Sequence, residues 1–321
     1  MAHKIPLIVI GGPTAVGKTA LSIELAKHFD GEIINGDSIQ IYKGLDIGTG
    51  KIKPDEMQNI PHHLLSFLEV NQTYDANQFK IDAHKSILEI NARKKLPIIV
   101  GGTGLYLEGL LYDLEYGGKA SRSQSVRTRL GERLNEIGEF ALWDELNQID
   151  PTAAANIPYQ NSQRVIRALE VIEVTGDLFS QQQSHQKQES VYQELIFILN
   201  RPRSELYDRI NLRVDKMIDE GLEQEVYRLY QLVDGEKVAS TKGIGYKEWW
   251  PYFENQMSIE DVVEQIKQHS RRYAKRQLTW FRNRLTHTHW LDNQDEALAI
   301  NEAITMVTQY LSNIEKGKMN D

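Results

Sequence analysis

The chain of 321 residues contains no cysteine, which excludes disulfides and zinc sites built on thiolates. Its apolar runs are short, and none approaches the roughly 20 residues that a membrane-spanning helix needs. The first of them, residues 5–10, leads into a glycine turn and not into the cleavage site of a secretion signal. These absences predict a cytoplasmic protein that makes no contact with a membrane.

Positive charge is also in deficit, since 37 Lys and Arg residues are outnumbered by 45 Asp and Glu residues and the net charge is -8. This balance argues against a protein that binds nucleic acid over its whole surface, but it leaves room for local basic clusters. Residues 271–284 are such a cluster, with six cations, three aromatic residues and no acid. A solvated helix face normally includes Glu, so this composition favours contacts to nucleic-acid phosphates and bases.

The chain is organised around residues 12–19, which read GPTAVGKT and fit the pattern GxxxxGKT. The motif lies between a predicted buried strand at residues 5–10 and a predicted helix from residue 20. In this context backbone N–H groups surround a phosphate, the Lys18 ammonium neutralises it, and the Thr19 hydroxyl can ligate Mg²⁺. The residues of this predicted polyphosphate site are Gly12, Pro13, Thr14, Ala15, Val16, Gly17, Lys18 and Thr19. The motif alone does not say which polyphosphate is bound.

The order of apolar strands and amphipathic helices predicts an α/β fold. We expect a P-loop NTPase-like core, in which a parallel sheet carries helices on both faces, formed by residues 1–115 and 193–321. Residues 116–192 show helical periodicity without a strand signal, which predicts a helical insertion domain. The polar, Gln-rich residues 181–189 are predicted to be a mobile link out of it.

Several polar groups follow predicted strands, where open α/β sheets bind ligands. Asp37 comes after the strand at residues 31–36, and its carboxylate can either cap the next turn or act on a substrate. Residues 101–104 form a glycine turn where many P-loop ATPases place a magnesium-binding acid, which weakens an ATPase interpretation. His62 and His63 lack a third ligand at a metal-site spacing, so we interpret them as packing residues.

Further cations lie on the predicted helices. Arg209 and Arg213 share one helix face and could clamp a phosphate, or pair with Glu205, Asp208 or Asp215; the pattern leaves both possibilities open. Residues 240–247 form a basic glycine loop. A long helix is predicted from Ser258 to Arg284, with Asp261 at the capping-box position.

Together these motifs resemble those of the tRNA dimethylallyltransferases, the family that prenylates the exocyclic amine of the adenine next to the anticodon. The resemblance covers nearly the whole chain and rests on GPTAVGKT at 12–19, DSIQIYKGLDIGTGK at 37–51, GGTGLY at 101–106, QRVIRALEV at 163–171, KGIGYKE at 242–248 and KRQLTWFR at 275–282. The chain departs from the family at Val16, Ile39, Gly50 and Ile52, where Ser, Met, Ala and Pro are usual. Val16 removes one possible hydroxyl contact to the diphosphate.

The resemblance implies that residues 12–19 bind the diphosphate of dimethylallyl diphosphate, with Mg²⁺ on Thr19. It also implies that Asp37 is the general base and that Lys18, Thr19 and Arg213 complete the catalytic set. The partner would be the anticodon stem-loop of tRNA, bound by a monomer. The implied tRNA contacts are Asp37, Ser38, Ile39, Gln40, Thr103, Arg127, Gln163, Arg164, Val165, Ile166, Arg167, Lys242, Gly243, Ile244, Gly245, Tyr246, Lys247, Lys275, Arg276, Gln277, Leu278, Thr279, Trp280, Phe281 and Arg282.

Two other functions use the same residues differently. A small-molecule or nucleotide kinase would hold ATP on residues 12–19 and use Asp37 to activate a hydroxyl, but it leaves the basic aromatic helix unexplained. A non-catalytic RNA-binding module with a nucleotide-dependent switch leaves Asp37 without a task.

Overall fold

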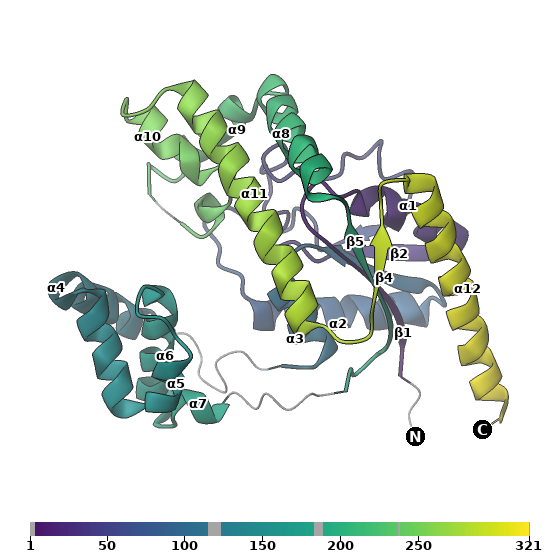
Figure 1. Ribbon diagram of the computed structural model, residues 1–321, viewed down its shortest axis with the longest axis horizontal. Helices are drawn as coiled ribbons and strands as arrows, with labels where there is room; N and C mark the ends of the chain where they lie inside the picture. Colours follow the sequence, from purple (N-terminus) through teal and green to yellow (C-terminus); the bar gives the residue numbers. More distant parts are fainter. Residues whose placement is uncertain (1–3, 115–122, 183–188, 237, 321) are drawn as a thin grey trace. The chain divides into compact units, whose positions relative to one another are not determined.

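The computed structural model describes residues 4–114, 123–182, 189–236 and 238–320 (Figure 1). The chain forms two compact units, one of residues 1–113 with 190–321 and the other of residues 114–189. The sequence predicted an insertion at 116–192, so its limits differ from these by two and three residues.

The first unit is built on a sheet of six parallel strands in the order β3-β2-β4-β1-β5-β6. The strands are β1 (Pro6–Gly11), β2 (Gly31–Asn35), β3 (His62–His63), β4 (Leu96–Gly101), β5 (Gln193–Asn200) and β6 (Thr288–Asp292). The inner strands are continuous apolar runs because helices cover both faces of the sheet. Strands β1 and β2 confirm the strands that were predicted at residues 5–10 and 31–36. This architecture confirms the predicted α/β fold class.

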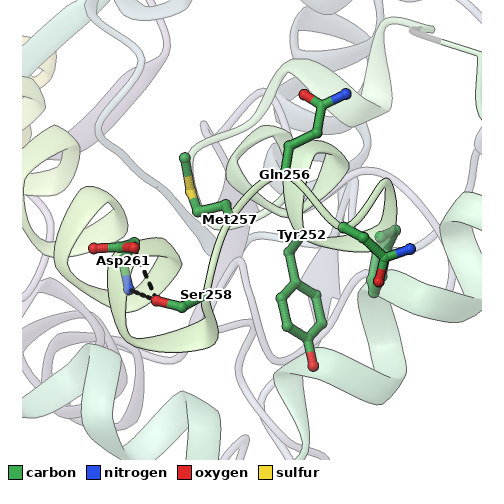
Figure 2. A pocket seen from close by; sticks show the side chains of 7 residues that line it. Tyr252, Gln256, Met257, Ser258 and Asp261 are labelled. Carbon is green, nitrogen blue, oxygen red and sulfur yellow. Dashed lines mark hydrogen bonds between the residues drawn. The ribbon is translucent and has the colours of Figure 1, made fainter.

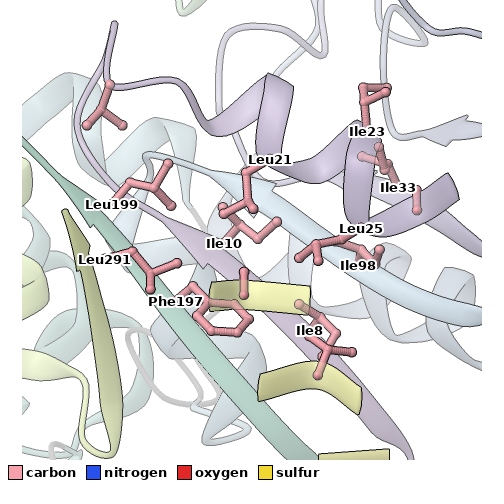
Figure 3. Packing of buried hydrophobic residues seen from close by; sticks show 14 of the residues in the cluster. Ile8, Ile10, Leu21, Ile23, Leu25, Ile33, Ile98, Phe197, Leu199 and Leu291 are labelled. Carbon is pink, nitrogen blue, oxygen red and sulfur yellow. The ribbon is translucent and has the colours of Figure 1, made fainter. Parts of the chain in front are cut away.

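Helices on the two faces bury alternate strand residues. Ile8, Ile10 and Phe197 pack on one face with Leu21 and Leu25 of α1 (Lys18–His28), and α12 (Glu296–Asn320) covers the same face (Figure 3). On the other face α2 (Ala76–Ala92) packs along β2 and β4 and against α3 (Gly104–Leu111). The Asp75 side chain caps α2, since it accepts hydrogen bonds from the N–H groups of Asn77 and Gln78 in the first turn.

A second apolar cluster lies beyond the sheet and contains the buried side chains of Tyr246 and Trp249. It is formed by α8 (Arg203–Asp219), α9 (Leu222–Leu232), the short turns η1 (Ser240–Lys242) and η2 (Lys247–Trp249), α10 (Trp250–Phe253) and the first half of α11 (Ile259–Arg284). The 26 residues of α11 span about 39 Å. Ser258 caps this helix, as predicted, by accepting from the Asp261 N–H.

The second unit contains only helices among its described residues: α4 (Gln124–Ile149), α5 (Pro151–Ala155), α6 (Ser162–Thr175) and α7 (Phe179–Gln182). Gly138 interrupts α4 with a φ of 82°, and the core is formed by residues such as Leu142, Leu146 and Leu169. Residues 183–188 of the predicted Gln-rich link lie outside the described residues. Among the described helices of the whole chain, none combines the length and the apolar character that crossing a membrane requires.

Because all six strands are parallel, their carboxyl ends meet at one edge of the sheet. The phosphate loop follows β1, Asp37 follows β2, the glycine turn at 101–104 follows β4, and Asn293 follows β6. Residues that are up to 281 positions apart in the sequence, 12 and 293, are therefore brought to one place. This is the edge at which open α/β sheets bind ligands.

Candidate active site

A cavity of about 720 Å³ opens at this edge. Seven cations line it, and Asp37 is the one acidic residue among its lining residues. The cations are Lys18, Arg209, Arg213, Lys216, Lys242, Lys247 and Arg276. Such an excess of positive charge in a partly enclosed space favours a polyanionic ligand.

The phosphate loop forms one wall of the cavity. Gly12 and Gly17 have φ angles of 148° and 106°, and Ala15 has a φ of 62°, a conformation that L-residues rarely adopt. Lys18 starts α1, and its Nζ donates to the carbonyl oxygens of Gly12 (3.0 Å) and Pro13 (2.7 Å). The loop thus combines a helix N-terminus with a folded-back ammonium, which is the arrangement that binds phosphate groups.

The surroundings of Lys18 tune its charge. Burial, and then the charge of Arg213, lower the pKa of Lys18 to about 8, while the Asp37 carboxylate acts in the opposite direction. At neutral pH the ammonium therefore remains protonated in most molecules. A bound phosphate would favour the charged form further.

Asp37 takes part in a tight turn and also faces the cavity. Its Oδ1 accepts from the Ile39 N–H (2.9 Å), while the Asn35 side chain accepts from the Asp37 N–H (3.0 Å) and donates to its carbonyl oxygen (3.0 Å). Among the described residues no donor bonds Oδ2. Both interpretations drawn from the sequence therefore fit the geometry: the carboxylate caps a turn and keeps one oxygen for the cavity.

Thr103 and Tyr273 lie close to Asp37. The Thr103 Oγ1 accepts from the Ser38 N–H (3.1 Å) and joins the glycine turn to the residue after Asp37. Burial, and then the charge of Asp37, raise the pKa of Tyr273 to about 12, so its hydroxyl keeps its proton. Tyr273 also lines the cavity.

Arg209 lies at the phosphate loop and Arg213 lines the same cavity, and both donate to backbone carbonyl oxygens and not to carboxylates. The Arg209 Nε donates to the Ala15 carbonyl oxygen (3.0 Å), and the Arg213 Nη2 donates to the Thr49 carbonyl oxygen (2.9 Å). Two of the carboxylates that could have paired with them have other partners: Asp215 pairs with Lys267, and Glu205 with Arg201. Both guanidinium groups therefore retain their charge for a ligand.

Two residues that the sequence analysis did not identify hold the phosphate loop in place. The Asn293 Nδ2 donates to the Val16 carbonyl oxygen (2.7 Å), and the Arg201 Nε donates to the same oxygen (3.4 Å). A Cβ at Gly17 would lie 2.4 Å from the Asn293 Nδ2, so the close approach requires glycine. No sequence motif includes Asn293, because it reaches the phosphate loop only through the pairing of β6 with β5.

Gln277, an expected tRNA contact, also has a structural role. Its side chain is buried, lies at the cavity and joins two loops of the core. Its Oε1 accepts from the Thr14 N–H (3.1 Å), and its Nε2 donates to the Gly102 carbonyl oxygen (2.9 Å). The long helix α11 thus positions the phosphate loop directly.

The other predicted contacts on α11 divide between two faces of the helix. Phe281 is fully buried beside Gly11, and Leu278 is partly buried against the sheet core. Trp280 is half-buried and lies against Gly104. The exposed members are Lys275, Arg276, Thr279 and Arg282. In this structure the Phe281 ring is therefore covered by the core, because a helix with one face on a core must bury part of any continuous motif.

Three more predicted tRNA contacts have large apolar side chains that are buried in a core. Tyr246 belongs to the apolar cluster around Trp249, and Val165 and Ile166 belong to the core of the insertion. Their neighbours Lys242, Lys247 and Arg164 are exposed. Residues 38–40 and 242–245 also line the cavity.

The basic residues of the insertion are largely neutralised. Arg127 and Arg167 both bond the Glu170 Oε2 at 2.8 Å, and Glu170 is fully buried. Burial alone would raise the pKa of Glu170, but the bonds from Arg167, Arg127 and the Ser123 N–H outweigh burial and lower it. Arg129 and Arg133 pair with Glu173 and Glu145. Within the described part of the insertion, Arg164 is the arginine without an acidic partner.

A second depression of about 560 Å³ lies at the start of α11 (Figure 2). Asp261 is the one charged residue that lines it, so it does not share the positive charge of the main cavity. Among the described residues no group of three His, Asp or Glu side chains could hold a metal ion. His63 bonds the Glu32 carboxylate (2.7 Å) and His62 the Ile60 carbonyl oxygen (2.8 Å), so both are packing residues as predicted.

Comparisons with known proteins agree with these features. The sequence profile of the family described as IPP transferase matches residues 40–284. The chain is 48% identical over 307 residues to a tRNA dimethylallyltransferase of Limosilactobacillus reuteri (strain DSM 20016), covering 95% of this chain and 98% of that protein.

Solved structures show the same relationship. A full-length tRNA isopentenylpyrophosphate transferase of Bacillus halodurans is 40% identical with a TM-score of 0.74, covering 98% of this chain and 100% of that one. A eukaryotic dimethylallyltransferase acting on tRNA is 30% identical with a TM-score of 0.82, covering 96% and 80% of the two chains. The resemblance drawn from the motifs is thus confirmed, and the chain belongs to the IPP transferase family, that of the tRNA dimethylallyltransferases.

Proposed function

We propose that this protein transfers a dimethylallyl group from dimethylallyl diphosphate to the exocyclic N6 amine of the adenine on the 3′ side of the anticodon in tRNA, and releases diphosphate. The proposal rests on one observation: Asp37 is the single carboxylate among the residues that line the cavity at the carboxyl edge of the sheet, and the other charged lining residues are seven cations. The cations suit the diphosphate, and the carboxylate suits the amine.

On the donor side, the bond between the allylic carbon and the diphosphate oxygen breaks while the diphosphate gains negative charge. Lys18, Arg209 and Arg213 lie where they can neutralise that charge together with the loop N–H groups. Lys18 would exchange the Gly12 and Pro13 carbonyl oxygens for phosphate oxygens.

On the acceptor side, the amine of adenine is a weak nucleophile because its lone pair is delocalised into the ring. As the new N–C bond forms, the amine proton passes to the Asp37 carboxylate, which contributes about 10²- to 10⁴-fold as a general base. The adenine must leave its stack to enter the cavity. Tyr273 and Ser38 line the cavity around Asp37 and would orient the adenine.

Mg²⁺ fits the donors that are present. Thr19 offers a hydroxyl in the cavity next to Lys18, and Mg²⁺ is commonly held by few protein oxygens together with phosphates and water. A bound Mg²⁺ would offset part of the charge that develops on the diphosphate.

The tRNA would lie across the cavity mouth, with its phosphates on the exposed cations of α11 and of residues 242–247. We propose the anticodon stem-loop as the bound region, a monomer as the acting form and the cytoplasm as the location. Arg164 of the insertion would contribute a further phosphate contact.

A variant with Lys275 and Arg282 both replaced by Ala is expected to bind tRNA with a flatter dependence of log affinity on log salt. Each lost phosphate contact should reduce the slope by about 0.7 to 0.9. The measurement is a filter-binding titration at several salt concentrations, with Lys316→Ala, an exposed cation of α12, as the control. An unchanged slope in the double variant would contradict the assignment.

The function itself is tested by incubating the protein with unmodified tRNA, Mg²⁺ and dimethylallyl diphosphate. We expect a mass gain of one dimethylallyl group on the tRNA, located to the anticodon loop by nuclease digestion. The kinase alternative predicts no gain on tRNA and consumption of ATP with a small acceptor instead. If the protein neither prenylates tRNA nor transfers phosphate from ATP, it is a binding module, and the proposal is contradicted.

A further inference from the structure

Resting on the proposed function, in which Arg213 binds the donor diphosphate, we propose that Glu225 and Tyr246 are positioning residues for Arg213. Glu225 and Tyr246 hold residues 46–50 in place by hydrogen bonding and packing. Residues 46–50 in turn hold the Arg213 guanidinium at the cavity. Neither side chain touches a reacting atom.

Glu225 lies on α9 with 3% of its surface exposed, and its carboxylate bonds three consecutive backbone N–H groups. Its Oε2 accepts from Asp46 (2.8 Å) and Ile47 (2.8 Å), and its Oε1 accepts from Gly48 (2.9 Å). A buried carboxylate is costly unless such bonds compensate it. The four lone-pair sites of a carboxylate match this set of donors, whereas an amide has one acceptor oxygen and would direct N–H groups at them.

The fourth donor to Glu225 is the Tyr246 hydroxyl, which bonds Oε1 at 2.7 Å. Tyr246 is fully buried, and burial together with the Glu225 charge raises its pKa, so the hydroxyl keeps the proton that it donates. The ring also supports the loop, since a Cβ at Gly48 would lie 2.6 Å from it. Tyr246 thus has a structural task that explains its burial within a motif expected to contact tRNA.

The loop passes this constraint on to Arg213. The Thr49 carbonyl oxygen, one residue after the bonded segment, accepts from the Arg213 Nη2 (2.9 Å) and the Gln40 Nε2 (3.3 Å). A Cβ at Gly50 would lie 2.0 Å from the same Nη2, so the guanidinium rests directly on the loop backbone. Any displacement of residues 46–50 must therefore move Arg213.

The other end of the loop is fixed independently. The buried Lys51 Nζ donates to the Tyr42 carbonyl oxygen (2.7 Å), the Ser66 hydroxyl (2.7 Å) and the Asp46 carboxylate (2.6 Å). Loss of the Tyr246 hydroxyl should therefore shift the loop without unfolding it. This separates a positioning effect from a general loss of structure.

The test is a double-mutant cycle on the binding of inorganic pyrophosphate, measured by calorimetry with Mg²⁺. Tyr246→Phe keeps the buried ring and removes only the hydroxyl, and Arg213→Ala removes the group that is positioned. We expect Arg213→Ala to weaken binding by about 10- to 100-fold and Tyr246→Phe to weaken it by about fivefold. In the Arg213→Ala background Tyr246→Phe should change affinity by less than about twofold, because its effect passes through Arg213.

The matched control is Tyr252→Phe, which removes a similar bond between a tyrosine hydroxyl and Glu223 of the same helix (3.1 Å) without touching residues 46–50. It should leave pyrophosphate affinity unchanged in both backgrounds. Glu225→Gln is a second variant. We expect it to weaken pyrophosphate binding more than Tyr246→Phe does, and to have no such effect in the Arg213→Ala background. Melting curves of all variants verify that the proteins are folded at the temperature of the titration.

Equal losses from Tyr246→Phe with and without Arg213 would overturn the proposal, as would no loss in either. If Arg213→Ala alone binds pyrophosphate normally, the positioning role is also overturned, and the mass-gain assay still decides the proposed function. If the unaltered protein fails to prenylate tRNA, the proposed function fails whatever the cycle shows.

Discussion

Replacement of Asp37 by Asn is expected to lower kcat for tRNA prenylation at least about 100-fold, which corresponds to about 2.7 kcal/mol of barrier. Asn keeps the shape of the side chain and can still accept from the Ile39 N–H, but it cannot take up the amine proton. The affinities for tRNA and dimethylallyl diphosphate should therefore stay close to those of the unaltered protein. The measurement is single-turnover prenylation with all substrates and Mg²⁺ saturating.

The second task of Asp37, capping the turn at Ile39, makes a control necessary. Asp75→Asn removes a carboxylate that caps α2 in a comparable way, through bonds from Asn77 and Gln78, but lies outside the residues that line the cavity. Because Asn still accepts from these N–H groups, this control should keep the cap and leave kcat intact. If the Asp37 variant behaves like this control, or recovers when Mg²⁺ is raised, Asp37 is not the base. A rate within about threefold of the unaltered protein would have the same meaning.

The parts of the fold that could be predicted from sequence are those that depend on local signals. The strand, loop and helix around residues 12–19 follow from spacing alone, and the cap Ser258 was identified from Asp261 three residues later. The edge strand β3 has two residues and therefore no periodicity to detect. The placement of Asp37 beside the phosphate loop followed from the parallel sheet, a rule about topology and not about contacts.

The contacts that hold the site together could not be predicted, because they join distant parts of the chain. Gln277 bonds a backbone group 263 residues away, and Asn293 bonds one 277 residues away. Glu225 and the N–H groups of residues 46–48 likewise meet only in the folded state. Each of these side chains is an ordinary polar residue in its own segment, and no spacing rule distinguishes it.

The division of a motif between core and surface also depends on the fold. The sequence treated residues 275–282 as one tRNA-binding stretch, but a helix that packs on a sheet buries every third or fourth residue. Gln277 and Phe281, four residues apart, occupy the buried face, whereas Lys275 and Arg282 are exposed. The insertion shows a similar effect for charge, since Arg127, Arg129 and Arg133 pair with carboxylates that lie elsewhere in its sequence.

The buried face of α11 predicts that Phe281→Ala lowers the free energy of unfolding by about 3 to 5 kcal/mol. Phe281 has no exposed surface, and its ring approaches Gly11 of β1 so closely that a Cβ there would lie 3.2 Å from the ring Cε1. Removal of the ring leaves a cavity between the helix and the sheet that surrounding residues fill only in part. Urea denaturation followed by circular dichroism measures the loss.

The comparison with Lys275→Ala on the same helix separates packing from RNA binding. Lys275 is exposed, so its replacement should change stability by less than about 0.5 kcal/mol and should weaken tRNA binding instead. Phe281→Ala should do the reverse: well below its lowered melting temperature it should bind tRNA with nearly unchanged affinity. If it instead loses affinity while its stability is preserved, then the ring leaves the core to stack on a base, and the buried position describes only the RNA-free state.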